Sequence, residues 1–277
     1  MSPEFSDNVA AATAGIREKC DGPVDLALVA GTGLGVLTAR ITADCVIPYG
    51  EIGGFAVSTA PGHQGALVIG TLNGRRVAAL SGRFHLYEGW SAEDIVLPIY
   101  VLRQLGAQRL VITNAAGALR SDLAVADALL ITDHISFQGQ HPLAGPNDDK
   151  LGPRFPDMSR AYDPELCAVA LKAAGRLGID LPTGIYAAVH GPEFETSAER
   201  RFLRLAGGDV VGMSTVLEVT AANHCGMSVL GFSAITNAAT GGPDQLPDTI
   251  EEILANADRA AGKMQQIILA MISDGDL

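Results

Sequence analysis

The sequence has few cysteines, no long apolar run and no excess of positive charge. Its four cysteines, Cys20, Cys45, Cys167 and Cys225, lie far apart, without a Cys-x-x-Cys pair or a zinc-like Cys/His spacing. We therefore expect no metal centre, and free buried thiols in a reducing, cytoplasmic location. No apolar stretch approaches the ~20 residues that span a bilayer, and no basic-then-apolar signal pattern opens the chain.

Acidic residues outnumber basic ones, 31 to 19, which gives a formal charge of −12 at pH 7. Nucleic acids and anionic membranes both require a cationic surface, so the composition argues against either as a general partner. An anionic substrate would need a few local cations that overcome the overall repulsion. The acidic balance therefore directs attention to individual basic side chains.

The chain has 277 residues, 48% of them hydrophobic, which is enough for a large core. It contains no internal repeat, charge block or linker-like run, so we expect one domain over residues 1–277. The opening Met-Ser-Pro-Glu-Phe is compatible with a vector remnant, and residues 1–5 are left out of the fold prediction.

Short β-branched runs alternate with helical periods, which predicts a single α/β domain with a mixed central sheet flanked by helices. Asn73-Gly74 is the favoured two-residue hairpin turn, so one strand pair is antiparallel. Ligands of such sheets bind where strands end in loops. The predicted strands are Val24–Ala30, Leu67–Leu72, Arg75–Leu80, Arg109–Thr113, Ala128–Thr132, Gly184–Val189 and Ser228–Thr236.

The clearest predicted helix is the last, which begins with a capping-box-like Asp248 and Glu251 and carries an apolar stripe to Met271. Ser91 is a candidate cap for a helix to Leu105, although Pro98 predicts a kink or a later start. Further helices are expected over Asp163–Leu177 and Thr196–Leu205.

A glycine-rich segment, Gly31-Thr32-Gly33-Leu34-Gly35, follows the first predicted strand. Its backbone N–H groups and the Thr32 hydroxyl could surround an anion. A tight strand–helix turn without a ligand explains it equally well. The segment is neither a Walker loop nor a complete G-x-G-x-x-G fingerprint.

A second candidate is the segment from Gly82 to Gly89, in which Arg83 and His85 alternate with apolar residues. In an extended backbone this alternation places both polar side chains on one face, and Tyr87 continues that face. Arginine and histidine together suit an oxyanion. The alternative is an edge strand with solvated charges.

Other polar segments are weak signals alone, because each has an ordinary structural explanation. Gly62-His63-Gln64-Gly65 and Thr113–Gly117 are plausible turns, and Glu195 could simply complement a helix dipole. Ser214 or Thr215 could cap the next helix or help to hold an anion. Asn237 follows a strand, where its amide could bind the edge of a heterocycle.

The order of these motifs is more specific than any one of them. GTGLG, GHQG, GRFHLYEG, TNAAG, HPLAGPNDD, GPEFET, VGMSTV and AITNA occur in succession. This succession resembles the trimeric purine nucleoside phosphorylase family from about Val24 to Thr240. The resemblance implies a nucleoside phosphorylase-like fold and a pentosyltransferase that cleaves 6-oxopurine (deoxy)ribonucleosides, such as inosine and guanosine, with phosphate.

The resemblance also assigns roles to residues. It implies phosphate binding by the side chains of Thr32, Arg83, His85 and Ser214, with the backbone N–H groups of Ala115 and His63 nearby. It implies that Tyr87 and Met213 contact the ribose and that the purine lies among Phe194, Glu195, Thr236 and Asn237. The implied catalytic residues are His85, Glu195 and Asn237.

The resemblance further implies a homotrimer in which Phe155 reaches into a neighbouring subunit's site. Phosphate would be a co-substrate, and neither a metal nor an organic cofactor is implied. Many members have a histidine before the last helix that contacts the ribose 5′-hydroxyl, but residues 241–250 contain none. The group that recognises this end of the sugar therefore stays open.

Three other functions remain alternatives. A methylthioadenosine phosphorylase suits Thr32 but typically has Asp where this chain has Asn237. A nucleoside-binding protein without catalysis would not need Arg83, His85, Glu195 and Asn237 together. A nicotinamide-dependent dehydrogenase is disfavoured by the incomplete glycine fingerprint.

Overall fold

A computed structural model describes residues 3–31, 35–57 and 64–277. The strands are β1 (Leu26–Ala30), β2 (Thr42–Pro48), β3 (Ala66–Leu72), β4 (Arg75–Ser81), β5 (Arg109–Ala118), β6 (Ala128–Ser136), β7 (Thr183–Ala188), β8 (Val210–Gly212) and β9 (Ser228–Ala238). The α-helices are α1 (Pro3–Lys19), α2 (Gly35–Thr38), α3 (Ala92–Gln104), α4 (Pro164–Leu177), α5 (Ser197–Leu205), α6 (Val216–His224) and α7 (Ile250–Ser273), and short 3₁₀ helices span Tyr49–Glu51 and Leu86–Glu88.

The strands form one mixed sheet in the order β2-β3-β4-β1-β5-β8-β7-β6-β9. Because β9 also pairs with β5, the strands β5, β8, β7, β6 and β9 form a closed ring of pairings. β1 pairs in parallel with β4 and β5, and all its residues are buried, as in a central strand covered on both faces. The predicted α/β class with a mixed sheet is confirmed.

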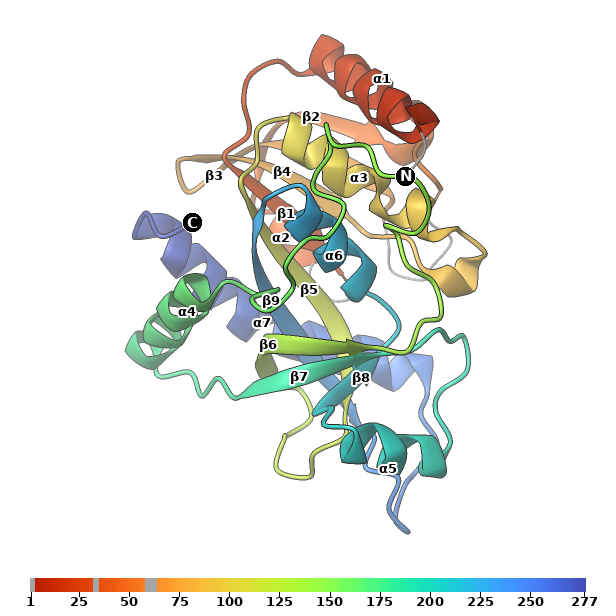
Figure 1. Cartoon of the computed structure of the whole chain (residues 1–277). Helices are drawn as coiled ribbons and strands as arrows, with labels where there is room; N and C mark the ends of the chain where they lie inside the picture. The colour runs from red at the N-terminus through yellow and green to blue at the C-terminus, as the bar shows by residue number, and fades with distance from the viewer. Residues whose placement is uncertain (1–2, 32–34, 58–63) are drawn as a thin grey trace.

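The helices cover this sheet in separate groups. α3 packs against α1 and α6, whereas α7 lies along β9 and against α4. Figure 1 shows α1 and α3 together at the top of the view, α4 on the left and α5 at the bottom. Within the described residues, no helix is long and apolar enough to cross a membrane.

The register of β5 sets the position of the candidate site. Gly117, near the end of β5, lies opposite Val211 on β8 and Asn237 on β9. A Cβ atom at Gly117 would lie 2.9 Å from the Ala239 Cβ and 3.1 Å from the Asn237 Nδ2. Glycine at position 117 therefore leaves room for the Asn237 amide beside the strand.

Several predicted strands and helices are present in the structure, but some of them begin or end at other residues than predicted. The hairpin turn has φ of 46° at Asn73 and 83° at Gly74, which is the left-handed backbone that its sequence favours. The strand predicted to end at Thr113 continues to Ala118. The Thr113–Gly117 motif is therefore part of β5 and not a turn after it.

Of two predicted helix starts, the Ser91 cap is confirmed and the Asp248 cap was wrong. α3 begins at Ala92 with Ser91 as its cap, so Pro98 lies inside the helix and does not delay its start. α7 is capped by Thr249, whose side chain accepts from the backbone N–H of Glu252. Asp248 is not the cap, because its carboxylate bonds to Asn237 and Arg200 instead.

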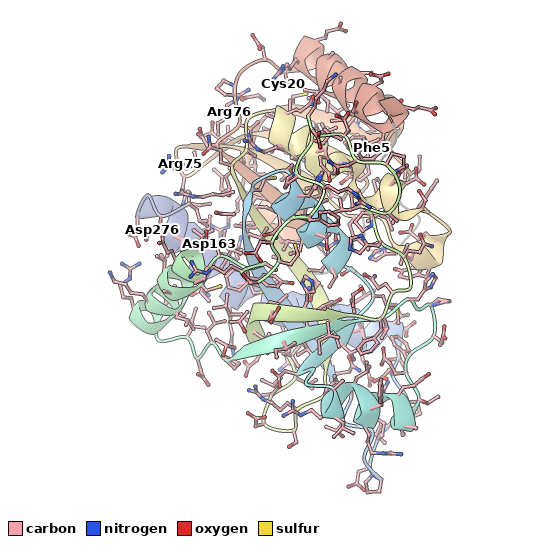
Figure 2. All side chains as sticks on the ribbon, in the orientation of Figure 1. Phe5, Cys20, Arg75, Arg76, Asp163 and Asp276 are labelled. Atoms are coloured by element: carbon pink, nitrogen blue, oxygen red, sulfur yellow. The ribbon has the colours of Figure 1, made fainter. Side chains whose placement is uncertain are left out.

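The first residues contribute to the core, although they were left out of the fold prediction. Phe5 on α1 is buried and packs edge-on against Tyr100 of α3, with ring centroids 5.4 Å apart. Figure 2 labels Phe5 on this helix, far from Arg75 and Asp276. At that other end, the Arg75 Nη2 donates to the backbone oxygen of Gly275 at 3.2 Å, which ties the β3–β4 hairpin to the end of α7.

Candidate active site

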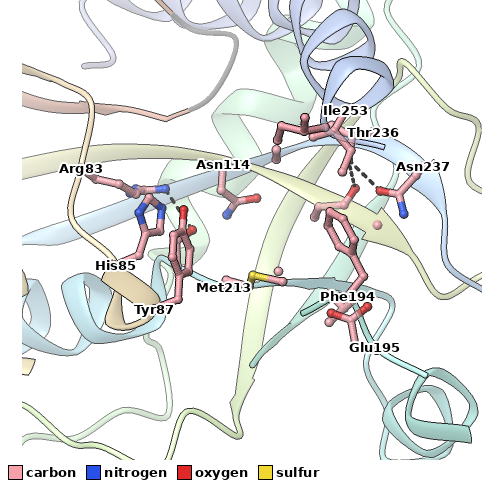
Figure 3. Close-up of a pocket in the computed structure, with 17 residues that line it drawn as sticks. Arg83, His85, Tyr87, Asn114, Phe194, Glu195, Met213, Thr236, Asn237 and Ile253 are labelled. Carbon is pink, nitrogen blue, oxygen red and sulfur yellow. Dashed lines mark hydrogen bonds between the residues drawn. The ribbon is translucent and has the colours of Figure 1, made fainter. Parts of the chain in front are cut away.

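One cleft collects most of the side chains that the sequence singled out. Its volume is about 730 Å³ with the adjoining open solvent included. Figure 3 shows Arg83, His85 and Tyr87 on one side, Glu195 and Asn237 on the other, and Met213 between. The lining residues are Arg83, His85, Tyr87, Asn114, Ala115, Ala116, Gly117, Phe194, Glu195, Val211, Gly212, Met213, Ser214, Thr236, Asn237, Ile250 and Ile253.

Arg83 is the buried cation of this cleft. Its Nε donates to the Glu218 Oε1 at 3.1 Å, and both side chains are at most 3% exposed. Its Nη1 donates to the Thr113 backbone oxygen at 2.7 Å and to the Ser214 Oγ at 3.2 Å. The guanidinium thereby joins the segment after β4 to β5 and to the start of α6.

His85 is oriented by a carboxylate three residues later. Glu88 Oε1 lies 2.8 Å from the His85 Nδ1 and also accepts from the His85 backbone N–H at 2.9 Å. An ionised carboxylate only accepts hydrogen bonds, so Glu88 fixes a proton on Nδ1. The ring stacks on Tyr87, with centroids 4.7 Å apart.

Tyr87 keeps its phenolic proton at neutral pH. Burial, followed by the charge of Glu88, raises the pKa of Tyr87 to about 12. A protonated phenol can donate a hydrogen bond to an oxygen of a bound sugar. The predicted extended backbone holds for His85, whereas Tyr87 lies in the 3₁₀ helix Leu86–Glu88. The edge-strand alternative was wrong, because Arg83 and His85 are buried.

The opposite end of the cleft presents a carboxylate and an amide. Burial raises the pKa of Glu195, while the neighbouring Arg200 partly offsets that rise. The Asn237 Oδ1 accepts from the Thr236 hydroxyl at 2.9 Å, and its Nδ2 donates to the Asp248 Oδ1 at 2.8 Å. Together they offer acceptors and a donor to a flat polar ligand edge, beside the Phe194 ring.

The structure brings most of the predicted site residues together in the cleft, and among the described ones only Phe155 lies outside it. Thr32 and His63 lie outside the described residues, so their phosphate contacts stay a prediction. Phe155 does not line the cleft; it is 85% exposed, with the Arg154 guanidinium carbon 5.3 Å from its ring centroid. The remaining predicted residues all line the cleft.

Several residues of this site were not predicted. Glu218 stands three residues after Thr215 at a helix start, a spacing typical of a capping box, so the sequence could have indicated it. Its Oε2 accepts from the Thr215 backbone N–H at 3.0 Å. Ile250 and Ile253 reach the cleft from the first turn of α7. Arg200 and Asp248 pair across 48 positions of sequence, which no local pattern indicates.

Comparison with known proteins decides the family. A family model described as the phosphorylase superfamily matches residues 25–273. The chain belongs to the phosphorylase superfamily. Purine nucleoside phosphorylase 1 of Bacillus subtilis is 45% identical to it over 97% of this chain and 99% of its own length.

Solved structures of other members of the superfamily have the same fold. Schistosoma purine nucleoside phosphorylase in complex with hypoxanthine is 37% identical, with a TM-score of 0.92 over 96% of each chain. The Schistosoma mansoni enzyme in complex with inosine is 36% identical, with a TM-score of 0.91 over the same shares. The likeness to the phosphorylase family that the order of motifs indicated is thereby confirmed.

We predict that Glu218→Gln lowers the free energy of unfolding by about 3 kcal/mol, because it leaves the buried Arg83 charge without its counter-ion. Urea denaturation of both proteins measures this. Asp122→Asn is the control, since it breaks the exposed Arg120–Asp122 pair, which solvent screens, and should change the free energy of unfolding far less. Equal losses in the two variants would contradict the prediction.

Proposed function

We propose that this chain is a pentosyltransferase that cleaves 6-oxopurine (deoxy)ribonucleosides, such as inosine and guanosine, with phosphate. The products are the free base and (deoxy)ribose 1-phosphate. The observation that carries this proposal is one cleft with a buried arginine and histidine at one end and Glu195 with Asn237 at the other. The hypoxanthine and inosine complexes of similar enzymes support it.

The cationic end of the cleft suits phosphate. Arg83 and His85 can donate to its oxygens, together with the Ser214 hydroxyl and the backbone N–H of Ala115. The Thr32 side chain and the His63 backbone would complete this set. Phosphate held beneath the sugar stabilises the positive charge that develops as the glycosidic bond breaks, and then bonds to the anomeric carbon.

Glu195 and Asn237 suit the departing purine. The ionised Glu195 can accept from the ring N–H of a 6-oxopurine and from the amino group of guanine. The Asn237 amide can accept from the imidazole-ring nitrogen once that nitrogen is protonated, and its Nδ2 can donate to the 6-oxygen. The proton on that nitrogen and the donation from the Asn237 Nδ2 offset the negative charge that the base takes up with the electrons of the broken bond, whereas Glu195 orients the base.

Tyr87 and Met213 lie between the two ends, where they would contact the ribose. His85, Glu195 and Asn237 are the proposed catalytic residues, and they act by positioning and electrostatics without a covalent nucleophile. Phosphate is the co-substrate, and we propose no metal or organic cofactor. We also propose a cytoplasmic location, in keeping with four free cysteines.

We predict that inosine turnover requires phosphate and exceeds adenosine turnover in kcat/KM. Adenine presents a bare ring nitrogen to Glu195, and an unpaired group there costs about 1–3 kcal/mol. Glu195→Ala should lower activity on inosine and guanosine. Turnover without phosphate, or a preference for adenosine, would overturn the proposed function.

Asn237→Asp should lower kcat/KM for inosine and shift the ratio toward adenosine, because a carboxylate can accept from a 6-amino group. In this variant two carboxylates would face each other, since Asn237 donates to Asp248. The double variant Asn237→Asp/Asp248→Asn separates that repulsion from base recognition. An unchanged ratio in both variants would contradict the role of Asn237.

We propose a homotrimer in which Phe155 contacts the nucleoside of a neighbouring subunit. An 85% exposed phenylalanine outside its own cleft supports this arrangement. Phe155→Ala should weaken nucleoside binding by about 1–3 kcal/mol, measured as KM and by calorimetry. Val46→Ala, which truncates another exposed side chain, is the control. A fully active monomer in sedimentation would contradict the proposal.

Recognition of the 5′ position of the sugar depends on the residues just before α7. Residues 241–250 contain no histidine, and Ile250 and Ile253 contribute apolar surface to the cleft. A site that does not hydrogen-bond a hydroxyl loses little when the hydroxyl is absent. We therefore expect similar kcat/KM values for inosine and 5′-deoxyinosine. Rejection of the deoxy compound by ~10⁴-fold or more would show that another group binds this hydroxyl.

A further inference from the structure

A buried charge network lies behind the base-binding end of the cleft. The Arg200 Nη2 donates to Asp248, and the Arg200 Nε lies 3.5 Å from the Glu195 Oε2. The side chains of Arg200, Asp248 and Glu195 are 3%, 6% and 8% exposed. One guanidinium thereby joins two carboxylates from different segments, and only Glu195 lines the cleft.

Asp248 decides how the Asn237 amide is turned. An ionised carboxylate only accepts, so the Asp248 Oδ1, 2.8 Å away, requires the amide nitrogen on its side. The Thr236 hydroxyl donates to the amide oxygen from the other side at 2.9 Å. Turning the amide over would place its oxygen against the carboxylate, an arrangement of two acceptors without a proton.

Arg200 holds Asp248 and Glu195 as one unit. Without this cation, two buried carboxylates would remain next to one another without a counter-ion, which is costly. Three charged groups act on Glu195: Arg200 lowers its pKa, whereas Asp248 and Glu199 raise it. The Glu199 carboxylate accepts from the backbone N–H of Thr196 at the start of α5, at 2.8 Å.

The loop that carries Asp248 is docked on the helix that carries Arg200. The Arg201 Nη1 donates to the backbone oxygen of Gly241 at 2.6 Å. Gly241 has a φ of +66°, and a Cβ atom there would lie 2.5 Å from the Ser197 backbone oxygen. The loop backbone therefore lies directly on α5, so Asp248 and Arg200 have a rigid common support.

We propose that Asp248 and Arg200 are positioning residues for base recognition: Asp248 sets the orientation of the Asn237 amide, and Arg200 holds Asp248 and Glu195 together. This inference rests on the proposed function. Neither residue touches the base; each acts through a residue that does. The oriented amide oxygen is then available to the protonated imidazole-ring nitrogen of the leaving purine.

The first experiment compares inosine with 7-methylinosine, whose base leaves without protonation at that nitrogen. Asp248→Ala should lower kcat for inosine about tenfold or more, the effect of one lost buried hydrogen bond, and kcat for 7-methylinosine less than about threefold. Asp248→Asn keeps an acceptor oxygen for Asn237 and should retain most inosine activity. Equal losses on both substrates, or none on inosine, would overturn the role of Asp248.

The second experiment measures the pH dependence of kcat/KM for inosine. Arg200→Gln removes the charge that lowers the pKa of Glu195. The fall in kcat/KM at acidic pH should therefore move to higher pH. Arg200→Lys keeps a positive charge and should move it part of the way back. Arg204→Gln is the matched control on α5, because Arg204 pairs with Asp209 instead. An unmoved acidic limb in Arg200→Gln would overturn the role of Arg200.

The activity of the wild-type protein distinguishes failure of the proposed function from failure of the positioning proposal. If the wild-type protein does not cleave inosine with phosphate, the proposed function fails. If the wild type is active and the variants behave like Arg204→Gln, only the positioning proposal fails. Calorimetric binding of hypoxanthine gives a second readout, in which Asp248→Ala should lower affinity while Arg204→Gln leaves it unchanged.

Discussion

The buried ion pair between Arg83 and Glu218 is the interaction on which the site depends most. The Arg83 guanidinium is buried in a protein whose net charge is −12, and its charge is balanced by Glu218. Its bonds to Thr113 and Ser214 hold three chain segments together at one end of the cleft. A preorganised cation of this kind can bind a phosphate without rearrangement, whereas the surface as a whole repels anions.

One end of the cleft presents hydrogen-bond donors and a cation, and the other presents acceptors. Both suit a phosphorolysis reaction. Phosphorolysis brings an anion toward a developing sugar cation and sends electrons into a base. In the proposed function, the Arg83 and His85 end would hold the incoming anion, and Glu195 with Asn237 would accept hydrogen bonds from the base. Three of these four groups have a buried partner that fixes them: Glu218 for Arg83, Glu88 for His85 and Asp248 for Asn237.

Local sequence patterns predicted turns and helix starts correctly where neighbouring residues alone determine the backbone conformation. The Asn73-Gly74 hairpin, the Ser91 cap of α3 and the helix predicted over Asp163–Leu177 follow from the preferences of neighbouring residues. The same kind of reasoning was wrong at Asp248, where a bond to Arg200, 48 positions away, replaces the local capping role. It also missed the short strand β8, because three residues carry too little periodicity.

The sequence by itself determined which chemical groups are available, and their order identified the phosphorylase family and most residues that line the cleft. Tertiary structure alone decided which of these groups meet. The ring of pairings through β5 and β9 places Gly117 beside Asn237, and the docking of residues 241–248 on α5 places Asp248 beside Arg200. The reason is physical: hydrogen bonds and ion pairs depend on distances in space, which local spacing does not encode for residues from different strands and loops.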